Sequence, residues 1–184
     1  MILADLQIDH TWTLFLDRDG VINKRMIGDY IRTWEQFEFL PGVMDAMRIF
    51  SARFGRVVVV SNQQGIGKGL MTDQELGDIH GRMTETILNS GGRIDKVYYS
   101  PHLEEEGSFL RKPNVGMALR AQKDFPAIRM NKSLMAGDSL SDMIFGRRCK
   151  MKTVLLSASK EDINKGYPYI DFAFPDLVSF ANNL

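Results

Sequence analysis

The sequence predicts an α/β fold: a doubly wound, Rossmann-like three-layer sandwich built on a mainly parallel sheet. The first observation is that short apolar runs rich in β-branched residues alternate along the chain with longer segments of helical spacing. Such alternation produces βαβ units, whose right-handed crossovers place helices on both faces of a parallel sheet. The second observation is that polar and acidic residues follow several of these apolar runs. Open α/β sheets bind ligands at the carboxyl ends of their strands, so this pattern also predicts where the functional site lies.

The individual elements follow from the same two periodicities. Apolar runs predict strands, in chain order, at 12–16, 56–61, 94–99, 133–137, 153–156 and 171–174. Helices are predicted at 43–54, at 72–90, from Pro113 to 125, through 143–144, and at 175–183. Thr72 and Glu75 have the spacing of a capping box, which favours a helix start there. Residues 24–40 are interpreted as a loop near the functional face.

Length and composition indicate an ordinary globular protein. The chain of 184 residues suits a single domain over 1–184, with residues 1–11 interpreted as an N-terminal arm. Its 23 basic and 23 acidic residues cancel, so no overall field favours nucleic acid or an anionic membrane as a partner. The single cysteine, Cys149, is compatible with a reducing compartment. With no membrane-span-like run and no signal-like start, the expected location is the cytoplasm.

Two acidic pairs stand at the ends of predicted strands. Asp17 and Asp19 directly follow the first apolar run, and Asp138 and Asp142 follow the run at 133–137. One alternative is that such aspartates merely cap turns. Two pairs on the same edge of one sheet favour a functional interpretation instead.

The chemistry expected of these residues is phosphoryl transfer. Carboxylates brought together repel one another unless a cation lies between them, and ligand sets made only of oxygen atoms suit Mg²⁺. With the metal bound, one carboxylate can attack an electrophile while a neighbour moves a proton. Ser61 and Lys112 can then hydrogen-bond or neutralise the oxygens of the phosphoryl group. Arg18 receives no role from this reasoning, and His80 is interpreted as part of the buried face of a helix.

Four motifs in order resemble the haloacid dehalogenase-like phosphohydrolase superfamily. They are Asp-Arg-Asp-Gly-Val at 17–21, Ser-Asn at 61–62, Lys-Pro at 112–113, and Gly-Asp followed by a second aspartate at 137–142. The resemblance covers residues 12–156. It implies that Asp17 is the nucleophile, which forms an aspartyl-phosphate, and that Asp19 is the general acid and then the base.

The same resemblance implies roles for the remaining polar residues. Ser61 and Lys112 would hold phosphoryl oxygens. Mg²⁺ would be bound by Asp17, Asp138 and the backbone carbonyl of Asp19. Asp142 would support the site by orienting Lys112 or metal-bound water.

Further stretches narrow the resemblance to a branch without a large cap domain, which holds heptose 1,7-bisphosphate phosphatases and histidinol-phosphate phosphatases. The short segments 24–40 and 100–112 agree with the absence of a cap, and the loop at 65–69 is closer to the heptose enzymes. The stretches that carry this likeness are 17–23, 37–39, 41–43, 61–66 and 111–113. The residues implied in substrate binding are Tyr30, Ser61, Asn62, Gln63, Gln64, Arg111, Lys112 and Ser139.

One departure concerns zinc. The branch usually carries a structural zinc on Cys-Pro-His followed by Cys-x-Cys, whereas this chain has Ser100-Pro101-His102 and later Ser108-Phe109-Leu110. Without thiolates a tetrahedral zinc site is implausible, so we expect Mg²⁺ and no structural zinc.

The expected function is therefore Mg²⁺-dependent hydrolysis of a small phosphorylated metabolite by a monomer, with no nucleic acid or membrane partner. A sugar bisphosphate of the D-glycero-D-manno-heptose 1,7-bisphosphate type is the first expectation, and histidinol phosphate or a range of sugar phosphates are the alternatives. A non-enzymatic alternative is a receiver-like module that is phosphorylated on an aspartate. Asp19 favours the enzyme, because fast turnover needs an acid/base two residues beyond the nucleophile.

Overall fold

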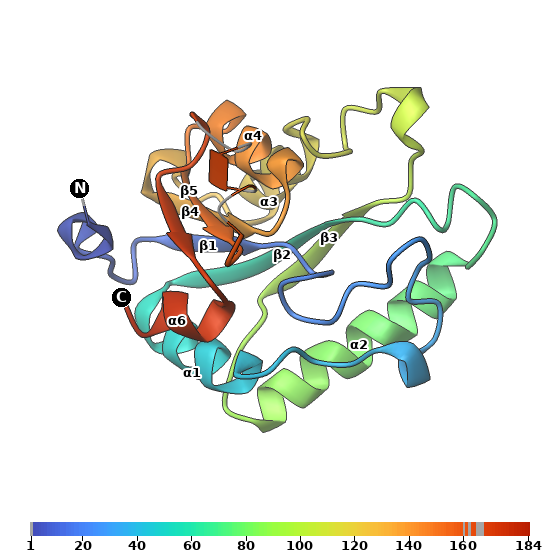
Figure 1. Ribbon diagram of the computed structural model, residues 1–184, viewed down its shortest axis with the longest axis horizontal. Coiled ribbons are helices and arrows are strands. Elements are labelled where there is room, and N and C mark those ends of the chain that lie inside the picture. The colour runs from blue at the N-terminus through green and yellow to red at the C-terminus, as the bar shows by residue number, and fades with distance from the viewer. Residues whose placement is uncertain (1, 160, 162, 165–167) are drawn as a thin grey trace.

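A parallel sheet forms the centre of the molecule, and its strand order is β3-β2-β1-β4-β5-β6 (Figure 1). The computed structural model describes residues 2–159, 161, 163–164 and 168–184. All six strands pair in parallel, which confirms the predicted fold class. The strands are β1 (Thr13–Leu16), β2 (Arg56–Asn62), β3 (Lys96–Ser100), β4 (Ser133–Gly137), β5 (Lys152–Leu156) and β6 (Phe172–Phe174). The helices are α1 (Val43–Arg53), α2 (Asp73–Asn89), α3 (Gly116–Asp124), α4 (Leu140–Arg148) and α6 (Leu177–Ala181).

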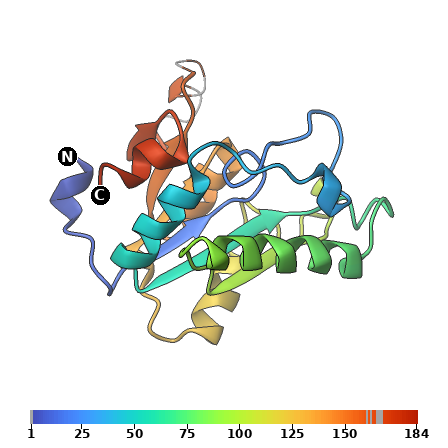
Figure 2. The same ribbon diagram turned by 90° about the horizontal axis from the view of Figure 1, so that it is seen from below.

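Alternating side chains divide the core into two apolar layers, one on each face of the sheet. Leu14 and Leu16 of β1 point into the layer beneath α1, α2 and α6, whereas Phe15 points into the layer beneath α3 and α4. Val57 and Val58 of β2 divide in the same way. Figure 2 shows α1 and α2 lying across the first of these faces. Strands buried on both faces read as continuous β-branched or apolar runs, which is why they were readily predicted.

The order of strands places the functional edge. The chain runs from β1 outward to β2 and β3, then returns so that β4 pairs with the other side of β1. The crevice where strand order reverses therefore lies beyond the carboxyl ends of β1 and β4. Asp17 follows β1, and Asp138 follows β4. The two predicted acidic pairs meet at this topological switch point.

Most predicted element bounds agree with the structure, with two corrections. The Thr72–Glu75 capping box is confirmed, since each side chain bonds the backbone of the other residue. The helix predicted to open at Pro113 begins at Gly116 instead, because residues 111–114 form a turn closed by the Asn114 N–H on the Arg111 carbonyl. The terminal helix is shorter than predicted and spans Leu177–Ala181.

The connecting segments also bear on the predictions. The interpretation of residues 24–40 as a loop is confirmed apart from a short 3₁₀ turn at Trp34–Gln36. In the N-terminal segment, Leu3–Leu6 forms another 3₁₀ turn, and Leu3 is buried in the core layer beneath α1. No helix in the described part of the chain is long and apolar enough to cross a bilayer.

Candidate active site

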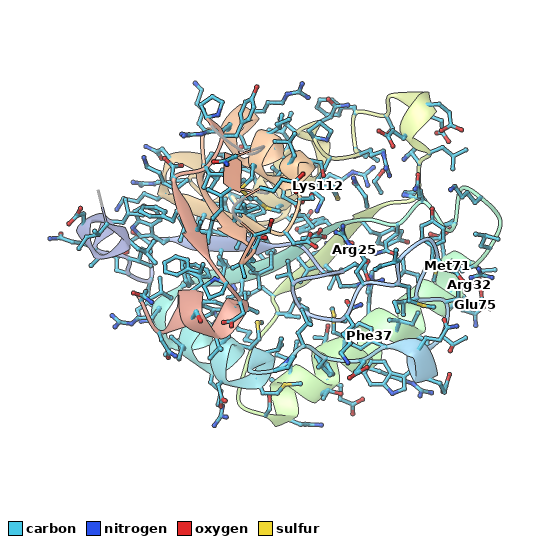
Figure 3. The ribbon with its side chains drawn as sticks, in the orientation of Figure 1. Arg25, Arg32, Phe37, Met71, Glu75 and Lys112 are labelled. Atoms are coloured by element: carbon cyan, nitrogen blue, oxygen red, sulfur yellow. The ribbon has the colours of Figure 1, made fainter. Side chains whose placement is uncertain are left out.

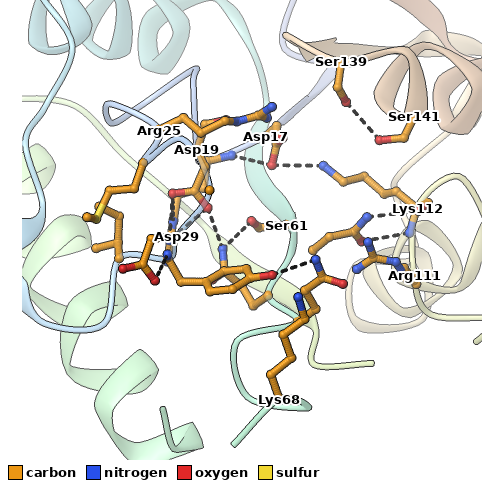
Figure 4. Close-up of a pocket in the computed structure, with 18 residues that line it drawn as sticks. Asp17, Asp19, Arg25, Asp29, Ser61, Lys68, Arg111, Lys112, Ser139 and Ser141 are labelled. Atoms are coloured by element: carbon orange, nitrogen blue, oxygen red, sulfur yellow. Dashed lines mark hydrogen bonds and ion pairs between the residues drawn. The ribbon is translucent and has the colours of Figure 1, made fainter. Parts of the chain in front are cut away.

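A cavity of about 470 Å³ opens at the switch point (Figure 4). Its lining includes every residue predicted to bind substrate, together with Asp17 and Asp19. It also includes basic residues to which sequence reasoning gave no role, namely Arg18, Arg25 and Lys68. Arg25 and Lys112, which come from different loops, both lie at this end of the strands (Figure 3).

Lys112 joins the two carboxylates nearest the centre of the sheet edge. Its Nζ lies 3.0 Å from Asp17 Oδ1 and 2.6 Å from Asp142 Oδ1, and donates a hydrogen bond of 2.8 Å to the Val60 carbonyl. Burial alone would lower the pKa of Lys112, but the two carboxylates raise it above its usual value. The ammonium is therefore charged.

Asn62 holds the backbone of that lysine in place. Its side-chain amide donates to the Lys112 carbonyl at 3.0 Å, and its carbonyl oxygen accepts from the Lys112 N–H at 2.9 Å. Asn62 was predicted to bind substrate, and these two bonds give it a positioning task toward Lys112.

Asp17 combines a fixed orientation with a poorly stabilised charge. Its Oδ1 accepts from the Arg18 N–H at 2.7 Å and faces Lys112, so Oδ2 remains without a hydrogen bond from the described residues. Burial, with the charges of Asp142 and Asp19, raises the pKa of Asp17 to about 6 despite the opposing effect of Lys112. An oxygen of this kind is free to bind a cation or attack phosphorus.

Asp138 is destabilised as an anion in the same way. Burial and the neighbouring Asp17 raise the pKa of Asp138 to about 7, although Arg25 opposes the rise. Arg25 Nη2 lies 2.8 Å from Asp138 Oδ1 and donates to the Asp19 carbonyl at 3.0 Å. One nitrogen of Arg25 thus contacts two of the groups predicted to bind Mg²⁺.

A cation fits this edge of the sheet. Carboxylate oxygens of Asp17, Asp138 and Asp142 lie within 4.8 Å of one another. Burial and the charges of neighbouring carboxylates raise the pKa values of Asp17 and Asp138, so a bound cation would stabilise both groups as anions. The Arg25 guanidinium contacts both the Asp138 carboxylate and the Asp19 carbonyl, so a positive charge is already accommodated beside these two groups. An all-oxygen donor set with these properties suits a hard divalent ion.

Asp19 is surrounded by hydrogen-bond donors. Both its oxygens accept from Arg18, at 2.8 and 2.9 Å, and each accepts one further bond, from Asn23 and Gln63. Burial pushes the pKa of Asp19 upward, but Arg18 and the two amides more than offset this, so its pKa lies below the usual range.

Gln63 links this carboxylate to Ser61. Its side-chain amide donates 2.8 Å bonds to Asp19 Oδ2 and to Ser61 Oγ. Because Ser61 Oγ accepts that bond, its own O–H is available to donate into the cavity. Gln63 was predicted to contact substrate; in the structure its side chain is buried but is part of the cavity lining, where it joins Asp19 to Ser61.

The remaining predicted residues also line the cavity. Gln64 donates to the Tyr30 hydroxyl at 2.8 Å, and Lys68 Nζ lies 5.3 Å from the centre of the Tyr30 ring. Arg111 is mostly buried and donates to the His102 carbonyl. Ser139 caps α4 and bonds Asp142 Oδ2 at 2.6 Å.

The stretch that corresponds to the usual zinc loop contains a different set of contacts. His102 Nδ1 lies 3.2 Å from Ser100 Oγ, and Glu104–Glu106 form an exposed 3₁₀ turn. Our expectation that this loop binds no zinc stays a prediction.

Comparison with known proteins settles the family. The family model for polynucleotide kinase 3 phosphatase matches residues 10–183, nearly the whole chain. The chain belongs to this family. It is a phosphatase with the haloacid dehalogenase-like fold and no large cap, as the motifs predicted.

Members of this fold family that resemble the chain include named heptose phosphatases. D-glycero-alpha-D-manno-heptose-1,7-bisphosphate 7-phosphatase from Mycobacterium bovis is 42% identical over 134 residues, which is 73% of this chain and 70% of that protein. The beta-heptose counterpart from Pseudomonas putida is 34% identical over 173 residues, covering 93% and 98% of the two chains. D,D-heptose 1.7-bisphosphate phosphatase from B. bronchiseptica, solved with magnesium and phosphate, superimposes with a TM-score of 0.84 and 26% identity over 93% of this chain and 96% of that one.

Proposed function

We propose that this phosphatase hydrolyses a phosphate monoester with Mg²⁺, through an aspartyl-phosphate on Asp17. The observation that carries the proposal is Oδ2 of Asp17, which accepts no hydrogen bond from the described residues and belongs to a carboxylate held by Lys112 at 3.0 Å within the cavity. A nucleophile needs one exposed lone pair and a fixed direction of attack, and these contacts supply both.

In the first step Asp17 Oδ2 attacks phosphorus, and the bond to the leaving oxygen breaks. Asp19 gives that oxygen a proton. The negative charge of a bound phosphate raises the pKa of a nearby carboxyl, which counteracts the lowering by Arg18. In the second step Asp19 takes a proton from water, which attacks phosphorus and releases Asp17. The Lys112 ammonium and the Ser61 hydroxyl stabilise charge on the phosphoryl oxygens.

Asp17, Asp138 and the Asp19 carbonyl are the proposed Mg²⁺ ligands. Asp142 supports them, since it fixes the Lys112 ammonium and accepts from Ser139 at the start of α4. When bound, Mg²⁺ neutralises phosphoryl oxygens and allows the carboxylates to stay ionised. Arg25 must leave Asp138 for the ion to bind, which frees its guanidinium within the cavity.

We propose that the substrate is a sugar bisphosphate, with the 7-phosphate of D-glycero-D-manno-heptose 1,7-bisphosphate the first choice. The names of the relatives support this, and so does the cavity lining, in which Lys68 and Arg111 offer cations for a second phosphate. Tyr30 and Gln64, bonded to each other, present a ring face and an amide to a sugar. Asn62, Gln63 and Ser139 act in the proposal through Lys112, Asp19 and Asp142 respectively.

The wider setting of the proposal follows the sequence expectations. The protein is a single domain over 1–184, a monomer in the cytoplasm, and its partner is a small phosphorylated metabolite without nucleic acid or a membrane. It carries no structural zinc.

A substrate panel tests the proposal. Phosphate release is measured with Mg²⁺ from both anomers of heptose 1,7-bisphosphate, histidinol phosphate, several hexose phosphates and a 3′-phosphorylated oligonucleotide. The proposal expects the highest kcat/KM for a heptose bisphosphate, loss of release with EDTA, and loss with Asp17→Asn. Highest activity on the oligonucleotide or on histidinol phosphate would overturn the substrate assignment. Full activity of Asp17→Asn would overturn the nucleophile.

A further inference from the structure

Arg18 and His80 form a buried pair next to the proposed acid/base, and neither residue has a role in the reaction described so far. The Arg18 side chain is 1% exposed, and its guanidinium is shared between two partners. One edge, through Nε and Nη2, bonds the Asp19 carboxylate, and Nη1 lies 3.1 Å from His80 Nε2 on α2. A chain of contacts thus connects the helix to Asp19.

The direction of the hydrogen bond between the pair follows from their chemistry. Arginine has only N–H donors, so His80 Nε2 must accept and the ring proton must lie on Nδ1. Burial and the adjacent Arg18 lower the pKa of His80 to about 3, which keeps the ring neutral and able to accept. A leucine or methionine at position 80 would leave one buried guanidinium N–H without a partner.

A purely structural explanation accounts poorly for this pair. Burying an ion pair gives little net stability, and replacing it with apolar residues is often neutral or favourable. The ion pair itself joins no distant parts of the chain, since the carboxylate partner of Arg18 is the next residue, and only the hydrogen bond to His80 reaches α2. The effect of the contact is local: the guanidinium fixes where the Asp19 carboxylate points.

Geometry shows what is fixed. Asn23 and Gln63 each hold one oxygen of Asp19 through a single bond from a neutral side-chain amide, at 2.9 and 2.8 Å. Nη2 of Arg18 donates to both oxygens, at 2.8 and 2.9 Å, and Nε approaches Oδ1 at 3.3 Å, so a single charged group spans the carboxylate and adds charge-assisted bonds to those of the two amides. His80 in turn limits the position of Arg18 from the opposite edge of the guanidinium.

We propose that Arg18 and His80 are positioning residues that hold the Asp19 carboxylate in the orientation needed to protonate the leaving oxygen. This inference rests on the proposed function, because it takes Asp19 as the acid/base. His80 touches neither the cavity nor Asp19 within the described contacts, so it acts only through Arg18.

The test compares leaving groups, because misplacing a general acid slows departure of a poor leaving group more than that of a good one. The two substrates are a sugar phosphate with an alkoxide leaving group and p-nitrophenyl phosphate. The quantity is kcat/KM, which reports steps only up to departure of the leaving group. His80→Leu removes the acceptor from Arg18, and His80→Gln restores one through its amide oxygen.

We expect His80→Leu to lower kcat/KM for the sugar phosphate by about ten-fold or more, and that for p-nitrophenyl phosphate by about three-fold or less. His80→Gln should recover most of the loss. Ile79→Ala, at a buried residue of the same helix that makes no hydrogen bond to Arg18 among the described contacts, is the control for damage to the fold, and should change kcat/KM for both substrates equally. Circular dichroism confirms that each variant is folded.

An equal loss on both substrates with His80→Leu, or no loss on either, would overturn the positioning role. Asp19→Asn separates this failure from failure of the proposed function. If Asp19→Asn discriminates strongly between the two leaving groups and His80→Leu does not, the acid/base assignment stands and the inference is wrong. If Asp19→Asn itself shows no discrimination, the acid/base assignment is wrong.

Discussion

Replacing Asp138 with asparagine should make the protein more stable when no divalent ion is present. Burial and Asp17 raise the pKa of Asp138 from 3.8 to about 7, and one pKa unit corresponds to about 1.4 kcal/mol. Above pH about 7, keeping Asp138 ionised in the folded state therefore costs at most about 4 kcal/mol. The ion pair with Arg25, which is 47% exposed, is lost in the variant and offsets about 0–1 kcal/mol. Asp138→Asn should thus gain about 1–3 kcal/mol near pH 8.

The sign of the pH dependence gives the check. Between the unfolded and folded pKa values of Asp138 the folded state binds more protons, so wild-type stability falls as pH rises from 3.8 to about 7. The advantage of Asp138→Asn should therefore shrink from about pH 8 to about pH 5, where wild-type Asp138 is protonated. Urea unfolding in EDTA measures this, and Mg²⁺ should stabilise the wild type more than the variant. A variant that is less stable than the wild type at about pH 8 in EDTA would refute the reasoning.

Three further substitutions probe the same edge of the sheet. Lys112→Met leaves Asp17 and Asp142 without their buried counter-ion. The free energy of unfolding, measured with urea near pH 8, should fall by about 3–5 kcal/mol, and a fall below about 1 kcal/mol would contradict the pairing. Gly20→Ala places a Cβ 1.9 Å from Asp138 Oδ2, at a residue with φ +89°. Calorimetry should show that Mg²⁺ binding is lost, and urea unfolding should show a loss of stability of about 1–2 kcal/mol. Unchanged Mg²⁺ affinity would contradict the assignment of Asp138 as a ligand. Arg25→Ala removes the guanidinium that contacts Asp138, so calorimetry should show Mg²⁺ binding up to about five-fold tighter. Weaker binding would contradict competition between Arg25 and Mg²⁺ for Asp138.

The sheet and the acidic pairs could be predicted because they leave strong local signals. Strands buried on both faces carry uninterrupted apolar runs, and parallel strands bring their carboxyl ends to one edge whatever their spacing in the chain. Asp17 and Asp138 could thus be placed together from the sequence. The start of α3 could not, because a proline at 113 suits the first turn of a helix as well as the turn that precedes it.

The missed residues are basic side chains whose role depends on tertiary geometry. Arg25 lies in a loop of mixed character, and only the fold brings its guanidinium onto a carboxylate 113 positions away. His80 is part of the apolar stripe of α2, so its spacing indicates burial and nothing about Arg18. The sequence predicted which residues line the cavity, but not which of them form hydrogen bonds with one another. The bond from Gln63 to Asp19, for example, depends on side-chain directions that only the structure gives.

Trapping of the phosphorylated enzyme tests the central claim most directly. The protein turns over p-nitrophenyl phosphate in the presence of Mg²⁺, and the reaction is quenched with borohydride, which reduces an acyl phosphate to the alcohol. The peptides are then sequenced by mass spectrometry. The account predicts homoserine at position 17, absent without substrate and absent in Asp17→Asn. Homoserine at another aspartate, or none at position 17 while phosphate is being released, would contradict it.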